Sequence, residues 1–320
     1  MEGKTGIVRA VCVSERKGVQ KQNVESAGFQ PQWGIIGDAH GGNWHRQVSL
    51  LSYDQVKKFN TLGAGVNHGD FGENLVVEGV DFRSLPVGTH LTCGDVVLEM
   101  TQIGKECHAH CQIYHKMGDC IMPREGVFAR VLQGGSISVG DVMEVGAGKG
   151  AELRAAVVTL SDKGASGERG DESGPLIRRL LEEAGYLVEV QMLLPDDREK
   201  LEALIKDLSD RRQLDLILTT GGTGFSRRDI TPEATLAVAE RAAPGIAEAI
   251  RANSMKITGR AMLGRGVSVI RGGTLIVNLP GSPKAVRESL EYVLPHLAHG
   301  IEVLRGDATE CGKAADETKP

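Results

Sequence analysis

Three polar segments in the second half of the chain contain residue types that bind phosphate. They are 161–171 (SDKGASGERGD), 219–232 (TTGGTGFSRRDITP) and 278–283 (NLPGSP). Glycine-rich turns expose backbone N–H groups that cradle anions, and hydroxyl and guanidinium groups add further donors. Asp229 adds a hard carboxylate oxygen, which suits the magnesium ion of a nucleotide. Each motif alone is typical of a tight turn or a helix cap, but three of them at one sheet edge would favour a ligand site.

A second concentration of reactive side chains lies in the first half, at 104–120 (GKECHAHCQIYHKMGDC). It contains three cysteines and three histidines, which are ligands for soft and borderline metals. The spacing C-x3-C-x8-C is not a standard zinc-finger spacing, so zinc stays an alternative. The other alternative is reduced cysteine packed in a small β core. That alternative suits Cys12 and Cys93, in apolar strands, better than thiols interleaved with histidines.

The phosphate-binding motifs need elements that bring them together, and the second half alternates strand-like and helix-like segments. We expect strands at 153–161, 186–194 and 214–220, and two more at 267–279 about a Gly-Gly turn. Helical apolar spacing predicts helices at 174–185, 197–212, 232–241, 244–254 and 282–304. Such alternation predicts a three-layer α/β domain with a mostly parallel sheet. The carboxyl ends of its strands form the expected ligand edge, and each of the three motifs follows a predicted strand.

The first half reads instead as short strands separated by Gly, Asp and Asn, at 8–14, 46–52, 73–79, 90–103 and 127–135. Strands at such spacing predict a β-barrel-rich domain. The glycine-rich stretch near residue 150 lacks large apolar residues and is typical of a linker. We therefore expect a first domain at 1–147, a linker at 148–153, a second domain at 154–306 and a flexible tail at 307–320.

Length and composition limit the class of protein. The chain has 320 residues, which favours two domains, and its net charge of -5 argues against nucleic acid as a partner. No apolar run approaches the length of a membrane span, and the first residues lack the apolar core of a secretory signal. We therefore expect a cytoplasmic protein with no membrane partner, in which the six cysteines are thiols or ligands rather than disulfides.

The second half resembles the MogA/MoaB family over residues 154–305. The resemblance rests on SDKGASGERGDESGP, DLILTTGGTGFSRRDITPEAT and NLPGSPKAVRESL. It implies adenylyl transfer from ATP and Mg²⁺ to molybdopterin, with a catalytic pair at Asp196 and Asp229 and the magnesium ion at Asp229. The nucleotide- and pterin-binding residues that it implies are Ser161, Asp162, Asp171, Gly221, Gly222, Thr223, Gly224, Arg228 and Ser282.

Two alternatives bear on this resemblance. Asp196 precedes a predicted helix, so it could be an N-cap rather than a catalytic residue. A related domain type, associated with nicotinamide-nucleotide deamidases, typically has the loop TGGLGPT. Thr223 and the Arg-Arg-Asp sequence that follows fit the adenylyltransferase branch better.

The first half resembles a MOSC domain over residues 3–146. The resemblance rests on GDAHG, RQVSLLS, GDFGENL, GKECHAHC and MPREGVFARV. It implies a key cysteine that carries sulfur or ligates a molybdenum cofactor; Cys107 is the first choice and Cys111 the second. Arg46 and His40 would hold anionic groups of that cofactor, with arginine favoured for phosphate. For Asn74 we favour hydrogen bonds that stabilise the fold over cofactor contact.

Together the two resemblances predict a molybdopterin adenylyltransferase with an accessory MOSC domain, since tethering raises the effective concentration for transfer. The alternative is a non-catalytic molybdenum cofactor carrier or storage protein. ATP and molybdopterin are the expected small-molecule partners, and a molybdenum insertase is a candidate protein partner. The resemblance of the second half to the MogA/MoaB family also implies a trimeric or hexameric homo-oligomer. The sequence leaves open molybdenum versus tungsten, and whether the MOSC half donates sulfur, holds cofactor or acts as a reductase.

Overall fold

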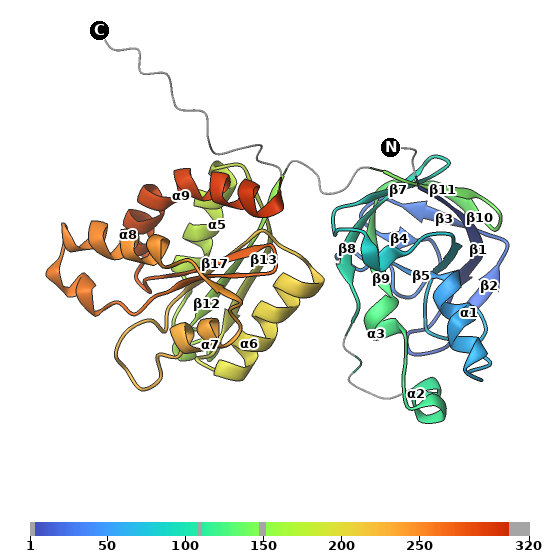
Figure 1. Cartoon of the computed structure of the whole chain (residues 1–320), viewed down its shortest axis with the longest axis horizontal. Helices are drawn as coiled ribbons and strands as arrows, with labels where there is room; N and C mark the ends of the chain where they lie inside the picture. Colours follow the sequence, from blue (N-terminus) through green and yellow to red (C-terminus); the bar gives the residue numbers. More distant parts are fainter. Residues whose placement is uncertain (1–3, 106, 108–110, 147–151, 307–320) are drawn as a thin grey trace, which may run out of the picture. The chain divides into compact units, whose positions relative to one another are not determined.

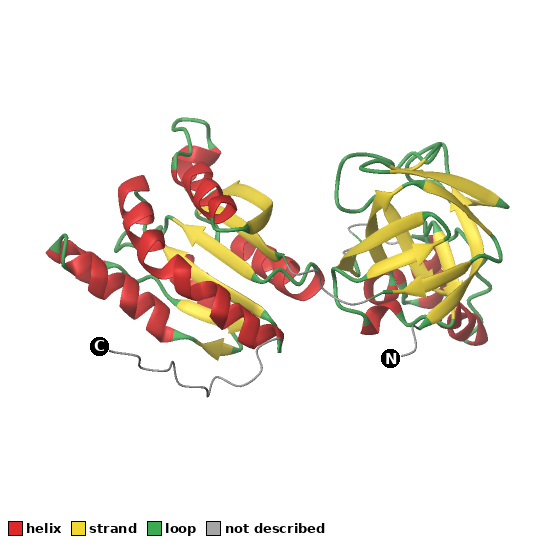
Figure 2. Cartoon of the chain, turned by 90° about the horizontal axis from the view of Figure 1, so that it is seen from above, coloured by secondary structure: helices red, strands yellow, loops and turns green. Residues whose placement is uncertain are grey.

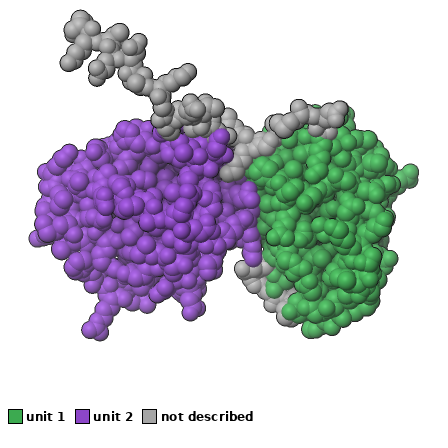
Figure 3. All heavy atoms as spheres, in the orientation of Figure 1, with its two compact units in different colours: residues 1–151 green, residues 152–320 purple. Residues whose placement is uncertain are grey.

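The computed structural model describes residues 4–105, 107, 111–146 and 152–306. The chain forms two compact units, Met1–Ala151 and Glu152–Pro320, which are coloured separately in Figure 3 and described here one at a time. The boundary between them falls inside the predicted linker. Residues 148–151 of that linker and the predicted tail at 307–320 lie outside the described residues. Within the described residues, no helix has the length and apolar character needed to cross a membrane.

The first unit is built around a closed β-barrel. Its strands are β1 (Thr5–Val13), β2 (Gln22–Val24), β3 (Ser26–Gln30), β4 (Gly34–Ile35), β5 (Val48–Ser52), β6 (Leu75–Glu78), β7 (His90–Cys93), β8 (Val96–Ile103), β9 (Val127–Gln133), β10 (Gly135–Ser138) and β11 (Val142–Val145). They pair in the order β11-β7-β8-β9-β5-β6-β1, and β1 pairs back with β11 to close the barrel (Figure 1). β2 is a further strand that pairs antiparallel with β1, and β10, β3 and β4 form a small separate sheet. The predicted β-barrel-rich domain is confirmed.

Alternation along the strands divides the apolar residues of this unit between two clusters. Val8 and Val11 of β1 belong to the main cluster, which is formed by the barrel strands, whereas Ala10 and Cys12 belong to a second one. That second cluster includes side chains of the helices α1 (Tyr53–Thr61), α2 (Gln112–Met117) and α3 (Met122–Glu125). A short 3-10 turn, η1 (Phe82–Ser84), completes the unit. Cys12 and Cys93 are buried in the two clusters, which confirms that they are core residues.

The second unit is a three-layer α/β domain. Its strands are β12 (Leu153–Leu160), β13 (Tyr186–Leu194), β14 (Leu216–Thr220), β15 (Arg241–Ala242), β16 (Ser268–Arg271) and β17 (Thr274–Leu279). They form one sheet in the order β13-β12-β14-β17-β16-β15. The four strands β13, β12, β14 and β17 are parallel, and β16 runs antiparallel to β17 across the predicted Gly-Gly turn. The predicted mostly parallel sheet is confirmed.

Helices cover both faces of this sheet, as Figure 2 shows. They are α4 (Asp162–Ala165), α5 (Ser173–Glu183), α6 (Arg198–Lys206), α7 (Thr231–Ala237), α8 (Pro244–Met255) and α9 (Pro283–Arg305), with single turns η2 (Asp207–Arg211) and η3 (Gly259–Leu263). In β12, Ala155 and Val157 pack with apolar residues of α5, α8 and α9, whereas Ala156 and Val158 pack with those of α6 and α7. The strands are therefore buried on both faces, which accounts for their almost continuous apolar sequences.

The two ends of this unit are joined by hydrogen bonds at the amino edge of the sheet. Arg305, the last residue of α9, donates from Nη2 to the backbone oxygen of Glu152 (2.7 Å) and to Oδ2 of Asp215 (2.6 Å). Glu152 directly precedes β12, and Asp215 directly precedes β14. Because these strands are parallel, their carboxyl ends lie at the opposite edge, where the three predicted phosphate-binding motifs follow them.

Candidate functional site

The three motifs of the second unit meet at the carboxyl edge of the sheet. Ser161 directly follows β12, Gly221 follows β14, and Gly281 lies just after β17. At Gly221, where φ is +89°, a Cβ atom would lie 2.2 Å from the backbone oxygen of Leu160. A Cβ atom on Gly281 would lie 3.4 Å from the Cα of Gly221. The glycines therefore allow the three loops to pack backbone against backbone.

A cavity of about 520 Å³ opens between these loops, and four predicted site residues line it: Ser161, Asp171, Gly221 and Ser282. Ser282 also caps α9, since its Oγ accepts a hydrogen bond from Ala285 N (3.2 Å). Asp171 uses both carboxylate oxygens inside the protein, one for Thr159 Oγ1 (2.8 Å) and one for Gly174 N (2.9 Å). Asp171 is thus fixed as part of the cavity wall.

The sequence did not single out two other lining residues, Arg169 and Ser173. Arg169 lies inside the first predicted motif, so its charge was a usable signal. Ser173 is buried at the start of α5 and donates from Oγ to the backbone oxygen of Gly281 (3.0 Å). No local pattern indicates that contact, because it joins residues far apart in the sequence.

Beside this cavity lie three acidic residues, Asp162, Asp196 and Asp229. Asp162 and Asp196 exchange hydrogen bonds, because the backbone N of each donates to the carboxylate of the other (3.0 and 3.1 Å). Asp162 also accepts two hydrogen bonds from the Arg228 guanidinium (2.8 and 2.9 Å), which lowers the pKa of Asp162. Arg228, predicted to bind phosphate, therefore pairs with an acid from another motif.

One carboxylate oxygen of Asp196 has no hydrogen-bond partner among the described residues. Its Oδ1 is buried and accepts no hydrogen bond from the described part of the chain, and a Cβ atom on Gly222 would lie 3.0 Å from it. Burial raises the pKa of Asp196, and the negative charges of Asp162 and Asp229 raise it further. A carboxylate in this state favours a bound cation, which would satisfy the oxygen and offset the repulsion.

The alternative reading of Asp196 as a helix cap is wrong. The N-cap of α6 is the next residue, Asp197, whose Oδ1 accepts a hydrogen bond from Lys200 N (3.1 Å). Asp197 has the extended backbone that a cap requires. The neighbouring residue takes the capping role, which leaves Asp196 facing the glycine loop.

Asp229 is held beside the same glycine loop. Its Oδ2 accepts a hydrogen bond from Ser226 N (2.7 Å), and a Cβ atom on Gly224 would lie 2.9 Å from that oxygen. Arg265 donates to the backbone oxygens of Gly224 (2.6 Å) and Asp229 (2.7 Å). Sequence reasoning missed Arg265, which lies outside all three motifs and acts here only through long-range contacts.

Thr223 lines a second cavity, of about 260 Å³, which is also bordered by Pro280 after β17. Its walls come largely from α8, η3 and α9, and include Arg251 and Thr258. Arg251 is held in place because its Nη1 donates to the backbone oxygens of Gly264 and Gly266 (3.0 Å each). The predicted binding residues are therefore not gathered in one cavity. Four of them line the first cavity, Thr223 lines the second, and Asp162 belongs to the group of three acidic residues.

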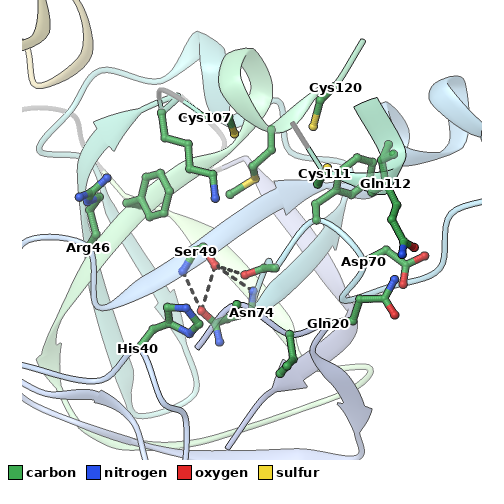
Figure 4. Close-up of a pocket in the computed structure, with 18 of the residues that line it drawn as sticks. Gln20, His40, Arg46, Ser49, Asp70, Asn74, Cys107, Cys111, Gln112 and Cys120 are labelled. Atoms are coloured by element: carbon green, nitrogen blue, oxygen red, sulfur yellow. Dashed lines mark hydrogen bonds between the residues drawn. The ribbon is translucent and has the colours of Figure 1, made fainter. Parts of the chain in front are cut away.

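In the first unit a cavity of about 800 Å³ brings together all four predicted residues, His40, Arg46, Cys107 and Cys111 (Figure 4). Cys120 also lines it. Cys107 and Cys111 are exposed, whereas Cys120 is buried, and this burial raises the pKa of its thiol. The two predicted cysteines are thus the accessible thiols of this cavity.

Two aromatic rings position the guanidinium group of Arg46. Its guanidinium lies over the rings of Trp44 (4.9 Å to the centroid) and Phe128 (5.7 Å), which is cation–π geometry. Its Nε is buried and has no hydrogen-bond partner within the described ranges. An anionic ligand in the cavity would supply that partner.

The zinc alternative gains no support from the described residues, in which no three His, Cys, Asp or Glu side chains are grouped so as to hold a metal ion. His108 and His110, which were part of that alternative, lie outside the described residues.

Buried charges lie next to the cavity, at Lys21 and Asp38. Their side chains form an ion pair and are 1% and 2% exposed. Asp38 Oδ1 accepts a hydrogen bond from His40 N (2.9 Å) and lies 3.2 Å from His40 Nδ1, so it orients this lining residue. Asn74 donates to Cys12 O (3.0 Å) and Asp38 Oδ2 (3.2 Å) and also lines the cavity, so its fold role in preference to cofactor contact stays a prediction. Sequence reasoning did not find Lys21, and it assigned no role to Asp38.

Comparison with known proteins agrees with both units. Residues 156–299 match the family model described as a probable molybdopterin binding domain, and residues 37–144 match that of the MOSC domain. A molybdopterin adenylyltransferase from Haemophilus influenzae is 43% identical over 144 residues, which are 44% of this chain and 73% of that protein. The enzyme of the same name from Escherichia coli K12 is 43% identical over 157 residues, covering 48% and 79%. The one from Helicobacter pylori J99 is 39% identical over 155 residues, covering 47% and 87%. Through its second unit the chain therefore belongs to the molybdopterin adenylyltransferase family, and its first unit carries a MOSC domain.

Proposed function

We propose that the second unit transfers the adenylyl group of ATP to molybdopterin and releases pyrophosphate. The observation that carries the proposal is the buried, unpartnered Oδ1 of Asp196, which lies beside Gly222 and is influenced by the charge of Asp229. Those two carboxylates would hold Mg²⁺ together with ATP. They need not form a complete protein cage, because Mg²⁺ is commonly bound by one or two carboxylates plus substrate phosphates and water.

The roles of the residues follow from the charge of the substrates. A phosphate monoester is already anionic at neutral pH and needs little help from a general base, so catalysis depends on orientation and charge neutralisation. The backbone of Gly221–Gly224 and the hydroxyls of Ser161 and Ser282 would hold phosphate groups. Mg²⁺, when bound, would neutralise the phosphates of ATP. Asp196 and Asp229 are therefore assigned to positioning rather than to proton abstraction.

The test is pyrophosphate release from ATP and Mg²⁺ in the presence of molybdopterin. We expect Asp229→Asn to fold but to lose activity by a factor of about 100 or more, by analogy with the removal of one electrostatic contact to a transition state. Asp207→Asn is the matched control, because this residue of η2 lies outside both cavities and contacts Arg211. Release close to wild type by Asp229→Asn would remove this residue from the mechanism.

The alternative function is a molybdenum cofactor carrier or storage protein without turnover. The same assay separates the two functions, because a carrier would bind molybdopterin without releasing pyrophosphate. The pair of carboxylates beside the glycine loop, Asp196 and Asp229, favours the enzyme. A protein that only binds a phosphate group would gain no affinity from a second, destabilised negative charge next to it.

For the first unit we propose a site that binds molybdenum cofactor or carries sulfur. The support is the single cavity that contains the accessible Cys107 and Cys111 together with Arg46 and His40. Cys107→Ser or Cys111→Ser should abolish binding of molybdenum cofactor, because a hydroxyl is a poor substitute for thiolate toward a soft metal. Pyrophosphate release by the second unit should be unchanged. If release also stops, the two units do not act independently.

Three further parts of the proposal concern partners and location. We propose a homo-oligomer, a trimer or a hexamer, which light scattering of the purified chain would test. A molybdenum insertase is the proposed protein partner, and co-purification with one would test it. The proposed location is the cytoplasm, and cell fractionation is the corresponding measurement.

A further inference from the structure

One wall of the cavity in the first unit is a tight turn at residues 69–72. Asp70, Phe71 and Gly72 line the cavity, and Figure 4 shows the side chain of Asp70 among those that border it. The turn is closed by a hydrogen bond from Gly72 N to Gly69 O (3.0 Å), and Lys21 N donates to the same oxygen (3.1 Å). At Gly69, where φ is +94°, a Cβ atom would lie 2.2 Å from the Lys21 backbone oxygen. The turn is therefore pressed tightly against the segment that carries Lys21.

The carboxylate of Glu73 holds this turn through hydrogen bonds with two of its backbone amides. Its side chain is fully buried, at 0% exposure. Oε1 accepts a hydrogen bond from Gly69 N (2.7 Å), and Oε2 accepts one from Phe71 N (3.1 Å). One carboxylate thus spans the turn, with each of its two oxygens accepting from a different backbone amide.

The groups that act electrostatically on Glu73 do not neutralise it. Cys12 of β1, Lys21 and Asp70 all interact with its charge. The only cation among these three is Lys21, and its ammonium is already paired with Asp38. Burial raises the pKa of Glu73, backbone amides including those of Gly69 and Phe71 lower it, and the charge of Asp70 raises it; together they leave it at about 7.

We propose that Glu73 is a positioning residue for this cavity and that protonation of its carboxylate releases part of the 69–72 turn. An ionised carboxylate can accept from both amides at once. In the protonated acid one oxygen becomes a hydroxyl that donates and accepts only weakly, so the amide facing that oxygen loses its charged acceptor. A buried N–H without a partner is unfavourable, and the turn must rearrange to satisfy it. The cavity wall formed by Asp70 and Phe71 would then change with pH near neutrality.

The inference rests on the contacts of Glu73 and is independent of what the cavity binds. It is tested on the full chain by nuclear magnetic resonance from pH 5.5 to pH 8.5. Carbon-13 in glutamate carboxyls reports the charge of Glu73, and nitrogen-15 in glycine and phenylalanine reports the amides of Gly69 and Phe71. We expect the carboxyl and at least one of these amides to titrate together, with a midpoint of about 7. We also expect one amide to become about tenfold less protected from hydrogen exchange as the pH falls through that midpoint, after correction for the intrinsic rate.

Two variants sharpen the test. Glu73→Gln mimics the protonated acid, so both amides should stay in their low-pH state at every pH. Asp70→Asn is the matched control, because Asp70 belongs to the same turn but does not contact these two amides. Its substitution should keep the coupled titration and only lower the midpoint, since the charge of Asp70 raises the pKa of Glu73.

Two outcomes would overturn the proposal. One is a Glu73 carboxyl that titrates while the amides of Gly69 and Phe71 keep their shifts and protection. The other is a Glu73 carboxyl that stays ionised from pH 5.5 to pH 8.5, as it would with its ordinary pKa of 4.5. If Glu73→Gln does not fold, the wild-type titration decides alone. Cys107→Ser should titrate like the wild type, so failure of the proposed cofactor site would be seen separately.

Discussion

Replacing Glu73 with Gln should change how the stability of the first unit depends on pH. The pKa of Glu73 is raised from its ordinary 4.5 to about 7 in the folded protein, so the folded state binds the proton more tightly than the unfolded state does. Wild-type Glu73 therefore contributes stability that is fully present below about pH 4.5 and is lost as the pH rises through about 7. The difference of about 2.5 pH units, at about 1.4 kcal/mol each, corresponds to about 3.5 kcal/mol in full, of which about 3 kcal/mol is lost between pH 4.5 and pH 7.5.

Urea unfolding followed by tryptophan fluorescence measures this effect in the intact chain. The two tryptophans of the sequence, Trp33 and Trp44, both belong to the first unit, so the signal reports that unit alone. The unfolding free energy of wild type minus that of Glu73→Gln should fall by about 3 kcal/mol between pH 4.5 and pH 7.5 and then level off. Subtraction cancels the other titrating groups, which both proteins share.

A matched control is Glu25→Gln, which removes an exposed carboxyl from the same unit. It should stay within about 0.5 kcal/mol of the wild type at every pH, as is usual for surface substitutions. A difference between wild type and Glu73→Gln that stays constant from pH 4.5 to pH 7.5 would refute the reasoning. It would mean that Glu73 is no harder to ionise in the folded protein than in the unfolded chain.

The remaining predictions concern the second unit and one core cysteine. Asp196→Asn should abolish pyrophosphate release. It should nevertheless stabilise the second unit by about 1 kcal/mol in calorimetry without ligands, because it removes a destabilised charge. Asp197→Ala should stay active and lower the stability by about 1 kcal/mol, because the helix loses its cap. Gly222→Ala should lose activity, since its Cβ would lie 2.5 Å from an oxygen of Thr231 and 3.0 Å from Asp196 Oδ1. Gly272→Ala has a similar positive φ with no atom within 4 Å, so equal activity losses in the two variants would argue against that clash. Cys93→Ser should destabilise the first unit by about 1–3 kcal/mol, because a hydroxyl replaces a thiol that is 1% exposed, and unchanged urea unfolding would contradict this.

Local patterns in the sequence predicted the features that depend on neighbouring residues. Glycine-rich segments after apolar strands predicted that the three motifs meet at one edge of the sheet, because parallel strands end at the same edge and Gly221 is needed for close approach. The same reasoning could not assign loop residues to a particular cavity. Thr223 faces a different cavity from Gly221, and this depends on backbone dihedral angles inside a four-residue loop.

Features that depend on distant contacts were not predictable. The sequence assigned no role to Lys21 or to Glu73, although Glu73 belongs to the GDFGENL motif. Lys21 is buried because it pairs with Asp38, and Glu73 because its carboxylate closes the 69–72 turn. The N-cap alternative for Asp196 was wrong for another reason: a capping rule locates a helix start only to within a residue or two, and here the neighbour Asp197 is the cap.

The hydrogen bonds of Arg305 bear on how this unit can be combined with others. They hold the last residue of α9 against Glu152, so the chain enters and leaves the unit at one place. That place is the amino edge of the sheet, whereas the glycine loops and acidic residues lie at the carboxyl edge. A protein segment attached at either end therefore starts away from the loops. Sequence joined to either end of the unit would therefore leave the residues of the glycine loops unchanged.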